Sequence, residues 1–232
     1  MDIRPGIFFP TTSEQDLYNV ANLLPQIPTV AAGPKDHGVS HIRIHKAKYP
    51  DLGCNCYDMN IMVEMLRQVG CNFFIHLNDD IFPVRYWLDY LLEGVEKCGI
   101  HCLYTLNDGI NTAPMSNFHA FSTKTMEIMG YPEGMYRQDG MQCYFLDTEV
   151  VLRAVKMGLL RYNRQARVIH QNHISLPERF RRENRQKKRS IKDDIPIFIK
   201  HMHAERINAY QLFKLADFQE ELKELDVPGY FK

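Results

Sequence analysis

The sequence lacks a net charge, a long hydrophobic run and a glycine-rich phosphate loop. Its 28 Lys and Arg residues balance 28 Asp and Glu residues over 232 positions. No apolar run approaches the ~20 residues that a membrane span requires, and the first residues do not have the order of a secretory signal. Neither a Walker loop nor a dinucleotide-binding fingerprint is present. We therefore expect a soluble, cytoplasmic protein that is neither a Walker-type nucleotide-binding protein nor a dinucleotide-binding protein.

The sequence also lacks a CxxC knuckle, although it has six cysteines. Cys54 and Cys56 are separated by one residue, and Cys98 and Cys102 by three, and neither spacing is the usual one of a structural zinc site. Several of the cysteines lie in or beside apolar runs. We therefore predict reduced, mostly buried thiols rather than zinc ligands or disulfides.

Apolar runs alternate with amphipathic segments through the first hundred residues. The clearest strand covers residues 72–77, and the clearest helix covers residues 55–69. Further strands are predicted at residues 6–9, 27–32, 39–44, 100–106, 118–121 and 166–169, and further helices after residue 13, from about residue 84, and at residues 123–129 and 148–156. This alternation predicts a mainly parallel sheet flanked by helices, whose ligands bind beyond the carboxyl ends of the strands.

The character of the chain changes at about residue 177. Eight basic residues and one acidic residue lie between positions 179 and 192. A helix with an acidic end is predicted at residues 195–225. We therefore expect a catalytic domain at residues 1–176 and, at residues 177–232, a basic segment with a helical extension.

Asn78, Asp79 and Asp80 directly follow the clearest strand. Adjacent carboxylates repel each other unless a cation or hydrogen-bond donors compensate them. Mg²⁺ and Mn²⁺ commonly use one or two carboxylates and complete their coordination with water and substrate phosphates. The alternative is that either Asp caps the helix that follows. The position after a strongly hydrophobic strand favours the metal site.

This segment, from Phe73 to Ile81 and on to Trp87-Leu88, resembles the core of family 2 GT-A glycosyltransferases. In that family an apolar strand ends in a DxD motif before an amphipathic helix, and here Asn78 replaces the first Asp. Other segments match in the order of the family: residues 10–14, 119–122, 146–149 with Arg153 and Gly158, and 168–170. Leu146 replaces the Glu of the family's Glu-Asp element. The resemblance covers roughly residues 5–175.

The resemblance implies an α/β protein with a GT-A-like, Rossmann-type, mainly parallel sheet. It implies metal-dependent transfer of a sugar from a nucleotide-sugar donor, expected to be a UDP-sugar, to an acceptor hydroxyl. Asp79, Asp80 and His170 would hold Mn²⁺ or Mg²⁺, and Asp147 would act as general base. Asp147 is alternatively a helix cap, and His170 is alternatively structural. The residues expected to contact the nucleotide are Pro10, Thr11, Thr12, Glu14, Asp36, Asn78 and Asp79.

The basic segment has three interpretations: a solvated surface, a polyanion-binding site, or attraction to an anionic membrane. The polyanion interpretation suggests an acceptor such as a hydroxymethylated DNA base. In the membrane interpretation, residues 195–199 would form an exposed apolar anchor and the acceptor would be a membrane-associated glycan. The residues expected to contact the acceptor or polyanion are His119, Arg179, Arg181, Arg182, Arg185, Lys187, Lys188 and Arg189.

Two other classes of protein compete with a glycosyltransferase. The first is a non-catalytic nucleic-acid-binding module on a degenerate GT-A core, which the replacements at Asn78 and Leu146 keep open. Such a module would neither turn over a donor nor be stabilised by a nucleoside diphosphate with metal. The second is a nucleotidyltransferase, whose usual glycine-rich N-terminal loop is missing here.

Overall fold

The computed structural model describes residues 2–11, 14–33, 42–47, 56–109, 116–129, 135–137, 146–170 and 194–207. Its strands are β1 (Pro5–Pro10), β2 (Thr29–Gly33), β3 (Ile42–Lys46), β4 (Phe73–His76), β5 (Ile81–Pro83), β6 (Leu103–Asn107), β7 (His119–Ser122) and β8 (Leu160–His170). Its helices are α1 (Glu14–Ala21), α2 (Cys56–Gln68), α3 (Trp87–Cys98), α4 (Thr123–Ile128), α5 (Leu146–Lys156) and a further helix at residues 194–204.

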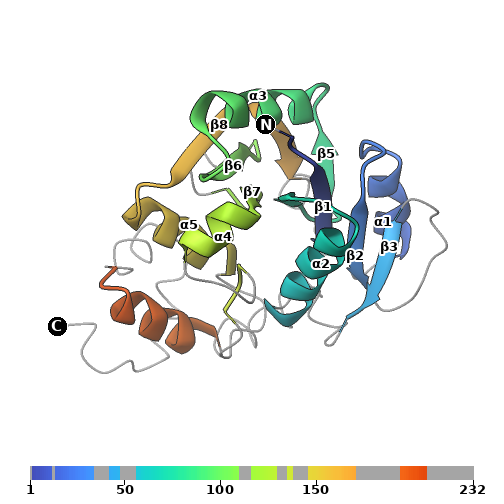
Figure 1. The fold of residues 1–232 in the computed structure, drawn as a ribbon. Coiled ribbons are helices and arrows are strands. Elements are labelled where there is room, and N and C mark those ends of the chain that lie inside the picture. The colour runs from blue at the N-terminus through green and yellow to red at the C-terminus, as the bar shows by residue number, and fades with distance from the viewer. Residues whose placement is uncertain are drawn as a thin grey trace.

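The strands form one sheet in the order β3-β2-β1-β4-β7-β6-β8-β5 (Figure 1). The first four strands of this order are parallel, as are β6 and β8. β7 runs antiparallel to both of its neighbours, and β5 runs antiparallel to β8. The sheet is therefore mixed but mainly parallel, which confirms the predicted fold class.

The sheet carries a hydrophobic core on each face. Apolar side chains of α1 and α3, such as Leu17 and Leu91, pack on one face. Side chains of α2, α4, α5 and helix 194–204, such as Met62 and Phe198, pack on the other. Each strand of the central sheet contributes alternate residues to the two cores, as the two-residue period of a strand requires.

Most predicted elements are present, and the differences are shifted ends and one additional short strand. β8 begins at Leu160 rather than at residue 166, because its exposed half lacks the apolar pattern that marked the buried half. β5 is only three residues long and was not predicted. Ser122 caps α4 as its hydroxyl accepts a hydrogen bond from the backbone N–H of Thr125.

Helix 194–204 is part of the core rather than an exposed extension. Ile195, Phe198 and Ile199 are buried, so they do not form the expected membrane anchor. The helix also ends before residue 225. Arg206 adopts a left-handed conformation (φ 55°), and the N–H of Ile207 donates to the carbonyl of Met202 (2.8 Å). This is the pattern of a Schellman C-cap.

Among the described cysteines, Cys71 and Cys102 are buried and Cys98 is exposed, and all of these are free thiols. The burial of Cys71 and Cys102 agrees with the predicted buried thiols, and the reduced state of the cysteines stays a prediction. Within the residues that the structure describes, no helix has both the length and the apolar character needed to cross a bilayer.

Candidate active site

Several chain segments meet at one edge of the sheet. β1, β4 and β8 end there, and β7 begins there because it runs in the opposite direction. β4 is followed by Asn78, Asp79 and Asp80, and β8 ends at His170. Sheet pairing places Ile81 opposite His170, so the acidic segment and the histidine become neighbours although 90 residues separate Asp80 from His170 in the chain.

Asp80 and His170 form the centre of this candidate site. Nε2 of His170 lies 3.0 Å from Oδ1 of Asp80, and both side chains are buried. The backbone N–H of His170 donates to the carbonyl of Asp108 (3.0 Å), which fixes the end of β8 beside β6. The structure therefore brings together two of the three residues that were expected to hold a metal ion.

Two amide side chains and one aromatic ring surround the imidazole of His170. Nδ2 of Asn78 lies 3.4 Å from Nε2, and Nδ2 of Asn117 lies 3.3 Å from Nδ1. The ring of Phe118 packs edge-on at 5.3 Å between centroids. These contacts hold the imidazole plane in place, and the sequence interpretation missed Asn117.

The donor set fits a hard divalent cation bound through two protein ligands. Oδ1 of Asp80 is buried and has no hydrogen bond of good geometry, although Nε2 of His170 is close to it. Two such groups, with phosphate oxygens and water, match the way Mg²⁺ and Mn²⁺ are held. Within the described residues, no group of three or more His, Cys, Asp and Glu side chains is arranged around a common metal position. Asp79, half-buried beside Asp80, is therefore not placed as a third ligand.

Asp147 lies in the first turn of α5 and is close enough for the charge of His170 to act on it. Burial raises the pKa of the Asp147 carboxyl above its usual value, against the opposing effects of hydrogen bonds from Thr148 and the charge of His170. Oδ1 accepts a hydrogen bond from the N–H of Thr148 (2.8 Å) within the first turn of the helix. A carboxylate with a raised pKa is suited to accept a proton.

The expected nucleotide contacts are described only in part. Pro10 ends β1, paired with Ala32 of β2, and Thr11 follows it with its side chain buried. A Cβ at Gly33 would lie 2.9 Å from Cγ2 of Thr11, so the two strand ends approach too closely for a larger residue. Glu14 is the first residue of α1, but its side chain, Thr12 and Asp36 lie outside the described residues.

His119 does not lie on an acceptor-binding surface, because its side chain is completely buried. Nε2 is 2.7 Å from the hydroxyl of Tyr136, and the ring packs 4.9 Å from the ring of His76. Burial lowers the pKa of His119 to about 3, and burial with the neighbouring His119 lowers the pKa of His76 well below its usual value. Both rings are therefore neutral core residues. The basic residues from Arg179 to Arg189 lie outside the described residues.

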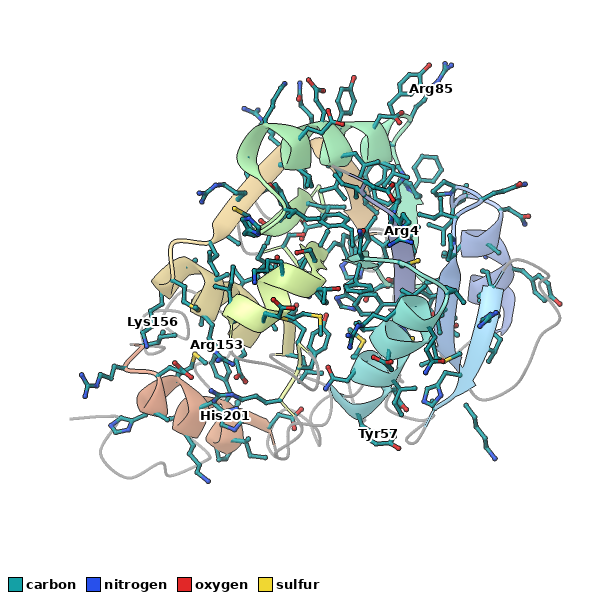
Figure 2. All side chains as sticks on the ribbon, in the orientation of Figure 1. Arg4, Tyr57, Arg85, Arg153, Lys156 and His201 are labelled. Atoms are coloured by element: carbon teal, nitrogen blue, oxygen red, sulfur yellow. The ribbon has the colours of Figure 1, made fainter. Side chains whose placement is uncertain are left out.

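Two further residues of the predicted Glu-Asp element, Glu149 and Arg153, serve the packing of α5. Glu149 is 2.9 Å from Nδ1 of His201 and 3.4 Å from Nε of Arg137. Arg153 donates to the carbonyl of Met129 (3.2 Å) and lies 3.5 Å from Glu205. Figure 2 shows Arg153, Lys156 and His201 where α5 faces helix 194–204. This buried ion cluster joins the two helices.

Leu146, the second departure from the family pattern, is also explained by packing. Its side chain is buried in the core that α5 shares with α2 and helix 194–204. An unpaired carboxylate buried among these apolar side chains would cost several kcal/mol. The replacement of Glu by Leu is therefore consistent with a core position in this chain.

No family model matches the sequence, and no curated protein matches it. Solved structures do match the fold. The mannosyltransferase PcManGT from Pyrobaculum calidifontis, in complex with GDP-Man and Mn²⁺, aligns with 86% of this chain and 65% of its own at 12% identity and a TM-score of 0.55. TarS 1–349 of S. aureus, in complex with UDP-GlcNAc, aligns with 96% of this chain and 78% of its own at 11% identity and a TM-score of 0.51.

Alignments with three other TarS structures cover less than two thirds of the neighbour. With a second structure of TarS 1–349 this chain spans 58% of the neighbour's length at 11% identity and a TM-score of 0.44. At such identities the likeness concerns the fold. Together with the strand order, it shows that the chain has a GT-A fold, the fold of these nucleotide-sugar glycosyltransferases.

Proposed function

We propose that the chain is a metal-dependent glycosyltransferase that moves a sugar from a nucleotide-sugar, in the first instance a UDP-sugar, to an acceptor hydroxyl. The observation that carries this proposal is the buried contact between Asp80 and His170 at the strand ends of a GT-A fold. Asp147, under the electrostatic influence of the same histidine, supports it. The neighbours PcManGT and TarS 1–349 were solved with GDP-Man and UDP-GlcNAc, which supports a donor of this class.

In this proposal Asp80 and His170 hold Mn²⁺ or Mg²⁺, with Asp79 next to them. When bound, the ion neutralises charge on the leaving nucleoside diphosphate. Asn78, which stands where the family has an acidic residue, lies beside the imidazole of His170. Thr11 and Pro10 form the wall where the nucleoside lies. Asp147 accepts the proton of the acceptor hydroxyl, and its raised pKa makes it a better base near neutral pH.

The second part of the proposal concerns the acceptor of the sugar. The eight basic residues between positions 179 and 192 favour an anionic acceptor, because Lys and Arg neutralise phosphates. A hydroxymethylated base in DNA is one such acceptor, and an anionic glycan is another. A cytoplasmic location is consistent with the free thiols and is part of the same proposal.

Thermal unfolding with nucleotides tests the donor and metal site. UDP, GDP and their sugars are added with and without Mn²⁺, and the pair that binds is expected to raise the Tm. Saturation at a hundred times Kd corresponds to about 2.7 kcal/mol. Asp80→Asn is expected to abolish the part of the Tm increase that depends on Mn²⁺. Asp89→Asn, an exposed acid on α3, serves as the matched control. A flat response of the wild type to every nucleotide would instead favour the non-catalytic binding module.

Donor hydrolysis and transfer test the base. Asp147→Asn is expected to keep the nucleotide-induced Tm shift and to lose turnover by about 10²- to 10⁴-fold. If this variant transfers sugar at the wild-type rate, Asp147 is not the base. If it loses binding as well, its role is in the donor site.

A further inference from the structure

One face of the sheet carries exposed side chains close to the candidate active site. In β6, Leu103 belongs to the core that α5 covers, and the two-residue period of the strand places Asn107 on the same face. Sheet pairing sets Arg167 of β8 opposite Asn107. Ile169 follows two positions later and pairs with Phe82 of β5. These four side chains therefore share one face of the last three strands of the sheet.

Exposure distinguishes this face from the one that α3 covers. Ile81 and Val168, which point the other way from the same strands, are buried in the core that includes side chains of α3. In contrast, Phe82 is 47% exposed and Arg167 is exposed. Neither Phe82 nor Ile169 belongs to either of the two described cores. The open face is the name used here for Phe82, Asn107, Arg167 and Ile169.

The side chain of Arg167 is unpaired. Within the part of the chain that the structure describes, its guanidinium makes no hydrogen bond and no ion pair. Gly109 (φ 79°) lies beside it, since a Cβ there would be 3.6 Å from the side chain of Ile169 and 3.8 Å from Nη2 of Arg167. The glycine therefore has no side chain that could cover the guanidinium. An arginine without a carboxylate partner is suited to bind a phosphate group through two parallel N–H···O bonds.

We propose that the open face binds the acceptor, and that this acceptor is a sugar or glycan that carries a phosphate group. The inference rests on the proposed function, because it assigns the acceptor side of the same site. Phe82 lies two residues after Asp80, and its pairing partner Ile169 is the neighbour of His170. The open face therefore ends at the candidate metal centre. Asp147, the proposed base, lies on α5, which packs on the same face of the sheet (Figure 1).

The chemistry of two side chains fits such an acceptor. The ring of Phe82 offers an apolar surface on which the C–H face of a sugar ring can lie, and the guanidinium of Arg167 can pair with the phosphate. A polar group placed beside an apolar surface fixes the orientation of a small substrate. An acceptor held at both points would keep one orientation relative to Asp147, which is what proton removal from its hydroxyl requires.

The charge of the open face favours a phosphorylated sugar over a nucleic acid. A nucleic acid is held by several cations along its backbone and by a series of stacked bases. The open face has one cation, Arg167, and one aromatic ring, Phe82. One arginine and one ring match a single phosphate group and a single sugar ring.

Matched pairs of sugars test the open face. Binding of glucose 6-phosphate and glucose, and of ribose 5-phosphate and ribose, to the full chain is measured by isothermal titration calorimetry without donor. We expect at least one phosphorylated sugar to bind about tenfold more tightly than its unphosphorylated partner. Arg167→Gln is expected to remove this difference, and Phe82→Ala is expected to weaken binding of the phosphorylated sugar about fivefold.

Two control variants change the same chemistry elsewhere. Arg161→Gln removes a charge from β8, but the guanidinium of Arg161 already donates to the carbonyls of Gly158 (3.1 Å) and Leu160 (2.7 Å). Tyr90→Ala removes an exposed ring from α3, on the other side of the sheet. Both variants should bind the phosphorylated sugar as the wild type does.

The outcomes separate this inference from the proposed function. Asp80→Asn is expected to lose the Mn²⁺-dependent response to nucleotides and to keep the binding of the phosphorylated sugar. Binding that depends on Arg167 in a chain that responds to no nucleotide would support the open face and refute the glycosyltransferase. Wild-type protein that responds to nucleotides but binds no phosphorylated sugar more tightly than its partner overturns the open face alone. So does Arg167-dependent binding of a single-stranded oligonucleotide without binding of either sugar phosphate.

Discussion

Glu149→Gln is the sharpest test of the buried ion cluster that joins α5 to helix 194–204. The carboxylate of Glu149 is almost completely buried, 2.9 Å from His201, 3.4 Å from Arg137 and 3.8 Å from Arg153. Glutamine keeps the shape but removes the charge that faces these groups. Removal of one partner from a buried ion pair typically costs about 3–5 kcal/mol, because it leaves an uncompensated buried charge.

The expected loss is large enough to measure directly. At about 2–4 °C per kcal/mol for a chain of this size, the Tm falls by roughly 6–20 °C. Urea unfolding followed by circular dichroism gives the free energy of unfolding. Glu64→Gln is the matched control, since Glu64 forms an exposed pair with Arg67 (2.9 Å) whose loss costs about 1 kcal/mol or less.

A double-mutant cycle with His201→Asn isolates the contact between Glu149 and His201. A coupling energy of about 0.5–3 kcal/mol is expected for groups in one network. If Glu149→Gln costs no more than the surface control, the cluster does not hold helix 194–204 and the reasoning fails.

Three further predictions concern single positions. Asp147→Asn is expected to raise the Tm at neutral pH. Burial raises the pKa of Asp147, so the wild type loses stability as the pH rises above 3.8 through that raised value. The gain in Tm should vanish at lower pH, and a gain independent of pH would contradict the prediction. His76→Phe is expected to move the midpoint of acid unfolding, followed by circular dichroism, to lower pH. The pKa of His76 is lowered, so the wild type loses stability as the pH falls below 6.5. His101 is exposed, and His101→Phe should leave the midpoint unchanged. Gly94→Ala is expected to cost about 1–3 kcal/mol in urea unfolding, since its Cβ would lie 2.6 Å from Nδ2 of Asn163. Helix propensity alone would make Gly94→Ala more stable than the wild type. That result would show that the Asn163 side chain moves aside to accommodate the Cβ.

Sequence reasoning singled out Asp80 and His170 as polar residues after apolar strands, and Asp147 through the resemblance to family 2 GT-A glycosyltransferases. It missed Asn117, which precedes β7. In a parallel sheet the residue before a strand lies at the edge opposite to the site. β7 is antiparallel to β4, with His119 paired to His76, so its amino end lies at the edge where Asn117 reaches His170. Strand direction depends on which strands become neighbours, and no local pattern carries that information.

His119 illustrates the opposite error. A histidine in the sequence His-Ala-Phe-Ser has the polarity of a surface contact, yet β7 occupies the middle of the sheet and both its faces are covered. Its ring therefore packs against His76 and Tyr136. Burial was decided by the insertion of β7 between β4 and β6, which pairs residues 43 to 49 positions apart with β4 and 14 to 16 positions apart with β6.

The sequence by itself determined the elements of this protein, since hydrophobic periods of 2 and 3.6 residues and capping residues act over a few positions. It also determined which strand ends carry acidic residues and histidine. Tertiary structure alone decided that Asp80 meets His170, that Glu149 and Arg153 serve packing, and that Ile195, Phe198 and Ile199 are buried. Tyr86 shows both contributions. The sequence places an aromatic residue before a helix, and only the folded chain shows its left-handed backbone and its exposure.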